Sequence, residues 1–262
     1  MVWKNPNNPS EGIAKYGYCI CNDTYKIEKK QTEQERKADI ENLFENLSDI
    51  WSERRGWWVS GAVNLSKITD TYSRTHTNTD IAVMHDRELL QFMVENAKKH
   101  NLYLFKKLWS GKTSLDSDSP VKYECFWPVD VDEAVKKHAK NKNYQFCLVN
   151  EQGHIITNNS IHDRIKLYFH DKKGKDIISR EEKKGILIPP EYLADQIIHQ
   201  TQSGSQIYGV DILYNKLLLE RILDTRKGKR APKHYQDLEI IMTQLELQKK
   251  SQESNSHAIK QA

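Results

Sequence analysis

The stretch of sequence that decides the fold covers residues 57–83 and reads WWVSGAVNLSKITDTYSRTHTNTDIAV. One apolar run leads into Ser60 and Gly61, and a second apolar run follows Asn78 and Asp80. We predict a buried strand, a turn into a short helix, a polar loop and a second strand. Small residues at a helix N-terminus leave backbone N–H groups free for phosphate, and side chains two positions apart on a strand point to the same side. The stretch therefore predicts a phosphate-binding turn beside a metal-binding strand.

The elements around this stretch predict an α+β fold, with a mixed sheet flanked by helices and followed by a C-terminal helical domain. Thr32 and Glu35 form a capping box at the start of one helix, which we expect to end at Gly56, and Asp86 is placed to cap another. Further strands are predicted over residues 102–109, 122–127, 144–149, 154–157 and 165–169, with a helix over 132–140. After Pro190 we predict helices to about 201, over 211–224 and from 232 onward, with a loop over 202–209.

This pattern divides the chain into four regions. Residues 1–34 are predicted to form an irregular arm, and residues 35–188 the α/β domain. Residues 189–248 are predicted to form the helical domain. Residues 249–262 are polar and are predicted to be a disordered tail.

Composition narrows the class of protein. The 262 residues carry a formal net charge of +4, a mild excess that suits an anionic ligand such as a nucleotide better than it marks a nucleic-acid-binding protein. No apolar run is long enough to span a membrane, and the first residues lack a signal-peptide pattern. The four cysteines have neither zinc-site spacing nor the density of a disulfide framework. We therefore expect a cytoplasmic protein with reduced thiols and no membrane partner.

Residues 57–83 resemble the nucleotidyltransferases of the polymerase-β-like superfamily, in particular the aminoglycoside and lincosamide nucleotidyltransferases and related nucleotidyltransferase toxins. In that family a W-x-x-x-G-G-type turn precedes an R-E-H-x-D-I-D-I-type strand. The positions that match this pattern, with a serine in place of the first glycine, are Ser60, Gly61, Arg74, His76 and Asp80. A second, weaker match has a helical Lys216 followed by an R-x-x-K-D-x-x-D-type segment, and its members are Arg230, Lys233, Asp237 and, in place of an aspartate, His234.

The resemblance implies transfer of a nucleoside monophosphate from a nucleoside triphosphate to an acceptor hydroxyl, with Mg²⁺ as cofactor. Asp80 would hold the metal. The acceptor is left open among a small molecule, an RNA end and a protein. The residues expected to meet the nucleotide and its phosphates are Ser60, Gly61, Arg74, His76, Lys216 and Lys233.

The chain departs from the family at the metal ligands. Asn78 stands where the first metal aspartate is expected. The family's third carboxylate aligns with Lys166 or, in an alternative alignment, with Thr157 or Asn158, none of which is an acid. A displaced acid such as Glu124 or Asp163 could complete a rearranged metal site. Two interpretations stay open: an enzyme with that altered site, or a catalytically degenerate protein that binds a nucleotide, RNA or a partner and has a regulatory role. A nucleic-acid-binding module that uses the basic turn at residues 226–230 is a third hypothesis.

Overall fold

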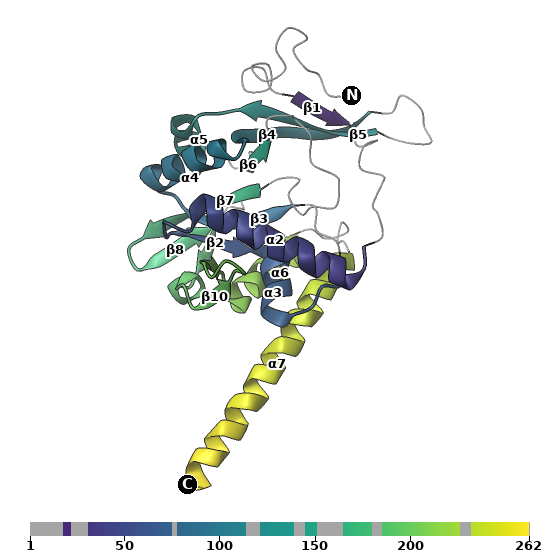
Figure 1. Cartoon of the computed structure of the whole chain (residues 1–262), viewed down its shortest axis with the longest axis vertical. Coiled ribbons are helices and arrows are strands. Elements are labelled where there is room, and N and C mark those ends of the chain that lie inside the picture. Colours follow the sequence, from purple (N-terminus) through teal and green to yellow (C-terminus); the bar gives the residue numbers. More distant parts are fainter. Residues whose placement is uncertain are drawn as a thin grey trace.

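The structure is a computed structural model that describes residues 18–21, 31–74, 78–113, 121–138, 145–150, 165–179, 185–225 and 232–261. It is an α+β fold with helices on both sides of a mixed sheet (Figure 1). The helices are α2 (Glu33–Trp51), α3 (Gly61–Thr69), α4 (Arg87–Lys99), α5 (Val131–His138), α6 (Ile212–Thr225), α7 (Pro232–Gln261) and the 3₁₀ turn η2 (Pro190–Leu193). The strands are β1 (Tyr18–Cys21), β2 (Trp57–Ser60), β3 (Thr79–Met84), β4 (Leu102–Thr113), β5 (Val121–Pro128), β6 (Gln145–Asn150), β7 (Ile165–Lys173), β8 (Asp176–Ser179), β9 (Ile186–Ile188), β10 (Ile197–Gln200) and β11 (Gln206–Gly209).

The described strands form one 11-stranded sheet with the order β1-β5-β4-β6-β7-β3-β2-β11-β10, while β8 and β9 extend from β7. Strand β3 lies beside β7 in parallel and beside β2 in antiparallel register. Strand β11 pairs with β2 in parallel. Strands β2 and β3 therefore lie inside the sheet, each with a partner strand on both sides, which explains why their apolar runs are almost continuous.

The main core lies on the face of the sheet covered by α2, α4 and α5. The predicted capping box of α2 is present, because the Thr32 side chain accepts from the Glu35 backbone N–H and the Glu35 side chain accepts from the Thr32 backbone N–H. The apolar residues of α2 are buried at helical spacing, and Trp51 donates its indole N–H to the Met93 carbonyl oxygen at 2.9 Å. Asp86 caps α4, as predicted.

Alternation along the strands places different residues on the opposite face, which α6 and η2 cover. Trp58, Ala82 and Tyr214 belong to the smaller core cluster on this side. Because side chains of a strand alternate between faces, Ser60 and Asp80 lie on the same side as Trp58 and Ala82. The candidate functional residues of the sheet therefore face α6 rather than the main core.

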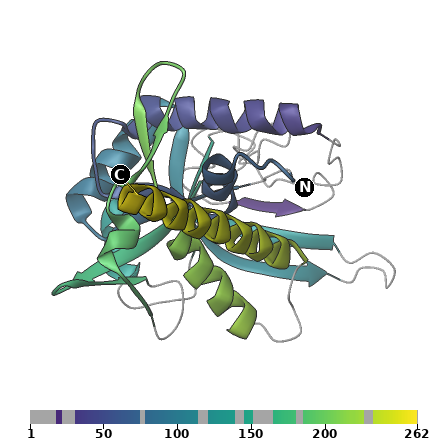
Figure 2. The same ribbon diagram turned by 90° about the horizontal axis from the view of Figure 1, so that it is seen from below.

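Residues 189–209 do not form the predicted helix to about 201 and loop over 202–209, and this part of the prediction was wrong. Pro190 opens only the short turn η2, and β10 and β11 follow it and join the sheet beside β2. Figure 2 shows the β10–β11 hairpin beside α2, where Ser203 at its tip donates backbone N–H and hydroxyl bonds to Glu45 at 3.0 and 2.8 Å. Tertiary pairing, rather than local helix preference, decides the conformation of this segment.

Two helix ends also differ from the prediction. Helix α2 ends at Trp51, and Gly56 lies at the start of β2 with a φ of +98°, a backbone conformation that favours glycine. Helix α7 begins at Pro232 as predicted but continues to Gln261, so residues 249–261 of the predicted disordered tail are helical. Residues 244–253 are rich in Gln, Glu and Lys, which are good helix formers, and α7 projects away from the body of the molecule (Figure 1).

None of the helices in the described part of the chain combines the length and apolar character needed to cross a lipid bilayer. Cys147 is buried, as expected for a small apolar residue on a central strand.

Candidate functional site

Three neighbouring strands place Ser60, Asp80 and Lys166 in one row across the sheet. Ser60 on β2 is the direct partner of Asp80 on β3, and Asp80 is the direct partner of Lys166 on β7. The Ser60 hydroxyl donates to the backbone carbonyl oxygen of Asp80 at 3.1 Å. Lys166 therefore lies directly beside Asp80, on the neighbouring parallel strand.

Asp80 lies among cationic and hydroxyl groups. Its Oδ1 is 3.8 Å from the Lys166 Nζ and 3.4 Å from the hydroxyl of Tyr168, which lies two positions further along β7. Its side chain is 29% exposed. Burial raises the pKa of the Asp80 carboxyl, and this effect outweighs the lowering by one hydroxyl and three cationic groups, which are Lys166, Tyr168, Lys233 and Arg74.

Among the described residues, the side chains around Asp80 do not form a set of ligands that suits Mg²⁺. That ion prefers carboxylates, phosphates and water in octahedral geometry, but the residue beside Asp80 on β7 is a lysine. Over the part of the chain that the structure describes, no three His, Cys, Asp or Glu side chains are grouped so as to hold a metal ion. The side chain beside Asp80 on β7 is thus a cation rather than a second carboxylate.

The predicted phosphate-binding turn is formed by the end of β2 and the start of α3. Gly61 has a φ of +67°, and a Cβ added to it would lie 2.7 Å from the Asp80 Oδ2, so glycine is required both by the backbone and by the close approach of the carboxylate. Ser60 is the N-cap residue of α3 but makes no side-chain capping bond. Instead the Gly61 N–H donates to the Asn215 Oδ1 on α6 at 2.9 Å.

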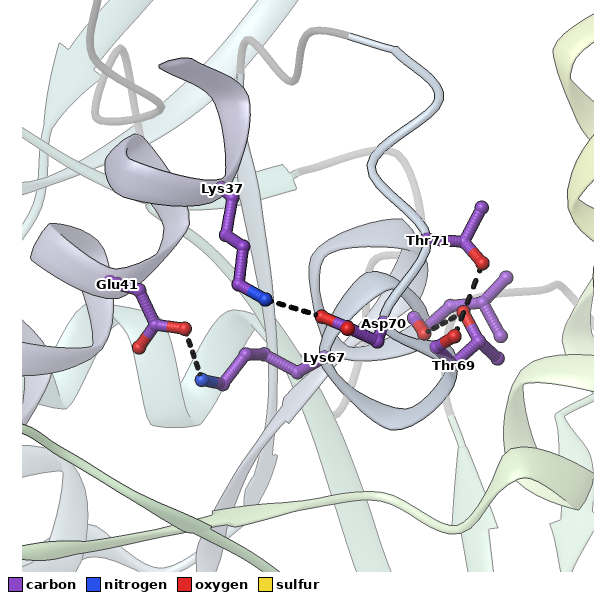
Figure 3. Close-up of polar contacts among 7 residues, drawn as sticks. Lys37, Glu41, Lys67, Thr69, Asp70 and Thr71 are labelled. Carbon is purple, nitrogen blue, oxygen red and sulfur yellow. Dashed lines mark hydrogen bonds and ion pairs between the residues drawn. The ribbon is translucent and has the colours of Figure 1, made fainter. Parts of the chain in front are cut away.

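The opposite end of α3 is fixed to α2 by two ion pairs (Figure 3). Lys67 Nζ lies 2.6 Å from Glu41 Oε1, and Lys37 Nζ lies 2.8 Å from Asp70 Oδ1. Asp70 ends the helix in the left-handed conformation, with a φ of 49°. These contacts orient α3 so that its N-terminus stays beside Asp80.

Arg74 approaches Asp80 from the loop before β3 and forms a two-pronged ion pair with Asp237 on α7. Its terminal nitrogen lies 2.7 Å from one Asp237 carboxylate oxygen, and its Nε lies 3.4 Å from the other. Asp237 is buried, with 9% of its side chain exposed. The two clusters that carry the family resemblance, far apart in the sequence, thus meet through this pair.

The remaining predicted residues lie at different distances from this centre. Lys233 is exposed at the start of α7, close enough for its charge to act on Asp80. Lys216 on α6 pairs with Glu220 one turn later, Nζ to Oε1 2.7 Å. Asn78 is half-buried immediately before β3. His76, Asp163, Arg230 and the predicted strand over 154–157 lie outside the described residues.

The structure does not bring Glu124 to Asp80. Glu124 is on β5, paired with β1 and β4. Four strand-to-strand steps separate β5 from β3, which amounts to about 19 Å along the sheet. A metal site shared by these two carboxylates does not follow from this topology.

Sequence reasoning missed two residues of the site, Tyr168 and Asn215. Tyr168 could have been found, because side chains two positions apart share a face of a strand and Lys166 was already aligned. The signal for Asn215 is a polar residue within the otherwise apolar run of α6, which alone does not point to any particular partner.

Comparisons of the chain with protein-family models, with characterised proteins and with solved structures found no match. The site is therefore judged on its own chemistry. It combines a helix N-terminus, a glycine that allows close approach and three cationic side chains, all of which favour an anion. The one carboxylate at its centre is Asp80.

Proposed function

We propose that this chain is a nucleotide-binding protein with a nucleotidyltransferase-like core, which holds the phosphates of a nucleoside triphosphate without transferring the nucleotide. The observation that carries the proposal is the place of Lys166, opposite Asp80 on parallel neighbouring strands and 3.8 Å from its carboxylate. A lysine at this position supplies a permanent positive charge where a transferase needs a carboxylate to hold a metal ion.

Phosphate recognition is supported by the geometry at the start of α3. The aligned peptide dipoles of a helix favour an anion at its N-terminus, and Gly61 leaves the backbone open to close contact. Lysine acts as a point charge toward phosphate, and arginine offers a planar fork. Lys166 and Arg74 provide both kinds of group within the electrostatic reach of Asp80.

Nucleotidyl transfer is disfavoured by the same arrangement. The two-metal mechanism needs ligands that hold two divalent ions about 4 Å apart. Asn78 offers only an amide at the first metal position, and the ammonium group of Lys166 repels a cation at the third. The regulatory, binding interpretation of the family resemblance is therefore the one that we adopt.

Nucleotide binding is expected to survive removal of divalent metal. Isothermal titration of the purified protein with ATP, GTP, CTP and UTP, each in excess Mg²⁺ and in excess EDTA, should give dissociation constants that agree within about threefold, a difference of less than 1 kcal/mol. A parallel assay should detect no release of pyrophosphate. Strictly metal-dependent binding together with pyrophosphate release would establish the transferase instead.

Replacing Lys166 should separate its role in binding from an effect of overall charge. Lys166→Met is expected to weaken nucleotide binding in EDTA by about tenfold or more, the scale of one charge-assisted hydrogen bond. Lys172→Met is the matched control, because Lys172 is an exposed lysine on the same strand. Equal affinities of the two variants would remove Lys166 from the binding site.

A further inference from the structure

The groups that the candidate site offers to phosphate are already bound to side chains of α6 and α7. Asn215 of α6 accepts the Gly61 N–H, and Asp237 of α7 pairs with Arg74. Both acceptors come from the C-terminal part of the chain, which lies more than a hundred residues after the turn. These phosphate-binding groups of the site are thus already paired with side chains of the same chain.

The side-chain oxygen of Asn215 occupies the place of an anion at the N-terminus of α3. Its Oδ1 is 2.9 Å from the Gly61 nitrogen, the position at which a phosphate oxygen would accept the same proton. The residue is only 3% exposed, and within the described part of the chain its buried Nδ2 has no hydrogen-bond partner. A buried amide group that lacks a partner is costly, so the contact is not an optimised structural cap.

The carboxylate of Asp237 occupies the place of a phosphate at Arg74. A carboxylate that engages both the Nε and a terminal nitrogen of a guanidinium uses the same fork that binds two phosphate oxygens. Its two contacts measure 3.4 and 2.7 Å. While this pair is intact, Arg74 cannot present that edge of its guanidinium to a nucleotide.

Helix α7 rests on α3 and α6 through a small apolar cluster that is separate from the main core. Its fully buried members are Leu65 of α3, Ile212 of α6 and Ile241 of α7. Beyond this contact α7 extends away from the body of the molecule (Figure 1), and Leu247 is exposed. The part of α7 that carries Asp237 is therefore held by few buried side chains, which is typical of elements that can open locally.

We infer that α6 and α7 act as an internal competitor of the nucleotide, with Asn215 and Asp237 closing the phosphate site until the ligand displaces them. This inference rests on the proposed function. The C-terminal helices then have a regulatory role. Anything that weakens the packing of α7 on α3 raises the affinity of the site for phosphate, and bound nucleotide in turn weakens that packing.

The charge-removing variant Asp237→Asn tests the competition directly. It keeps the shape of the side chain but weakens the pair with Arg74, so ATP in EDTA is expected to bind about tenfold more tightly than to the wild type. Glu239→Gln makes the same change of charge at an exposed position of α7 and should leave the affinity unchanged. Tighter binding by Asp237→Asn alone supports the inference.

Two other outcomes separate the inference from the proposed function. If the wild type binds ATP and Asp237→Asn binds it equally or more weakly, Asp237 only positions Arg74 and the inference fails, while the proposed function stands. If neither protein binds any nucleotide, the proposed function fails and the inference fails with it.

Hydrogen exchange on the unmodified protein gives a second test that does not depend on folding of the variant. Adding ATP is expected to speed amide exchange in peptides covering residues 232–245 and to slow it in peptides covering residues 61–66. Slower exchange in both regions would mean that the nucleotide binds without displacing α7, which overturns the inference.

Discussion

Lowering the pH from about 7.5 to about 4 is expected to reduce the free energy of unfolding by about 5 kcal/mol, through two buried histidines. Burial lowers the pKa of His170 to about 4, and burial together with the charge of Lys67 lowers the pKa of His199 to about 4. Both side chains are neutral in the folded protein near neutral pH. The loss is large compared with the total stability of a typical domain, about 5–15 kcal/mol.

Hydrogen bonds show why each histidine is held neutral. The Nδ1–H of His170 donates to the Tyr168 carbonyl oxygen at 2.8 Å, and its Nε2 accepts from the Tyr214 hydroxyl at 2.8 Å. The Nε2–H of His199 donates at 2.8 Å to the Asn64 Oδ1, since the Asn64 amide nitrogen is already bonded to the Val210 carbonyl oxygen. Neither ring has bulk water around it to stabilise a second proton.

The direction of the effect follows from the lowered pKa values. Unfolded histidine takes up its proton below a pH of about 6.5, whereas the folded protein resists protonation until the pH nears the folded pKa of about 4. The unfolded state therefore binds more protons in this window, and stability falls as the pH falls through it. Asp80 acts in the opposite sense, because its pKa is raised and its protonation at low pH relieves a buried charge.

Urea unfolding at a series of pH values between about 7.5 and 4 measures this loss. The variants His170→Gln and His199→Gln should each remove about half of the pH dependence, although each lowers the stability at neutral pH. His100→Gln is the matched control, since His100 is exposed at the end of α4. A slope that is unchanged in both buried-site variants would contradict the assignment.

The parts of the fold that were predicted correctly are those whose signals are local. The capping box at Thr32 and the cap at Asp86 each lie within one turn of the helix they start, and the apolar runs of β2 and β3 are bounded by residues close by in sequence. The β10–β11 hairpin gave no such signal. Its strands have four residues each, and β11 is aligned with β2 only through the pair Gly209 and Val59.

The residues of the candidate site also divide into those that local sequence signals place and those that they do not. Ser60, Gly61 and Asp80 could be placed from one continuous stretch, and Lys166 from strand alignment. The partners of these groups could not be predicted, because Asn215 and Asp237 are 154 and 163 positions away from the groups they bind. The packing of the helices decides whether an arginine faces a ligand or an internal carboxylate. No periodic pattern in the sequence reveals that packing.

Replacing Gly209 by alanine is expected to lower the free energy of unfolding by about 4 kcal/mol, the combined scale of an overpacked core and a broken buried hydrogen bond. A Cβ at this position would lie 2.0 Å from the Asn64 Oδ1 and 2.6 Å from the His199 Nε2. These are the two atoms of one buried hydrogen bond. The new methyl group must displace both side chains, since Asn64 is fully buried in α3 and His199 is nearly so in β10.

Gly204→Ala is the matched control for this substitution, because it lies at the tip of the same hairpin. Gly204 has a φ of +88° and no atom within 4 Å of an added Cβ, so alanine there should cost only the backbone strain of about 1 kcal/mol. Urea unfolding of both variants shows whether stability is lost through a steric clash at Gly209 or through any substitution in the hairpin. Equal losses of stability in the two variants would contradict the clash. Asn64 connects α3 to the hairpin, so the Gly209 variant should also weaken nucleotide binding at the N-terminus of α3, an effect that the Gly204 variant should lack.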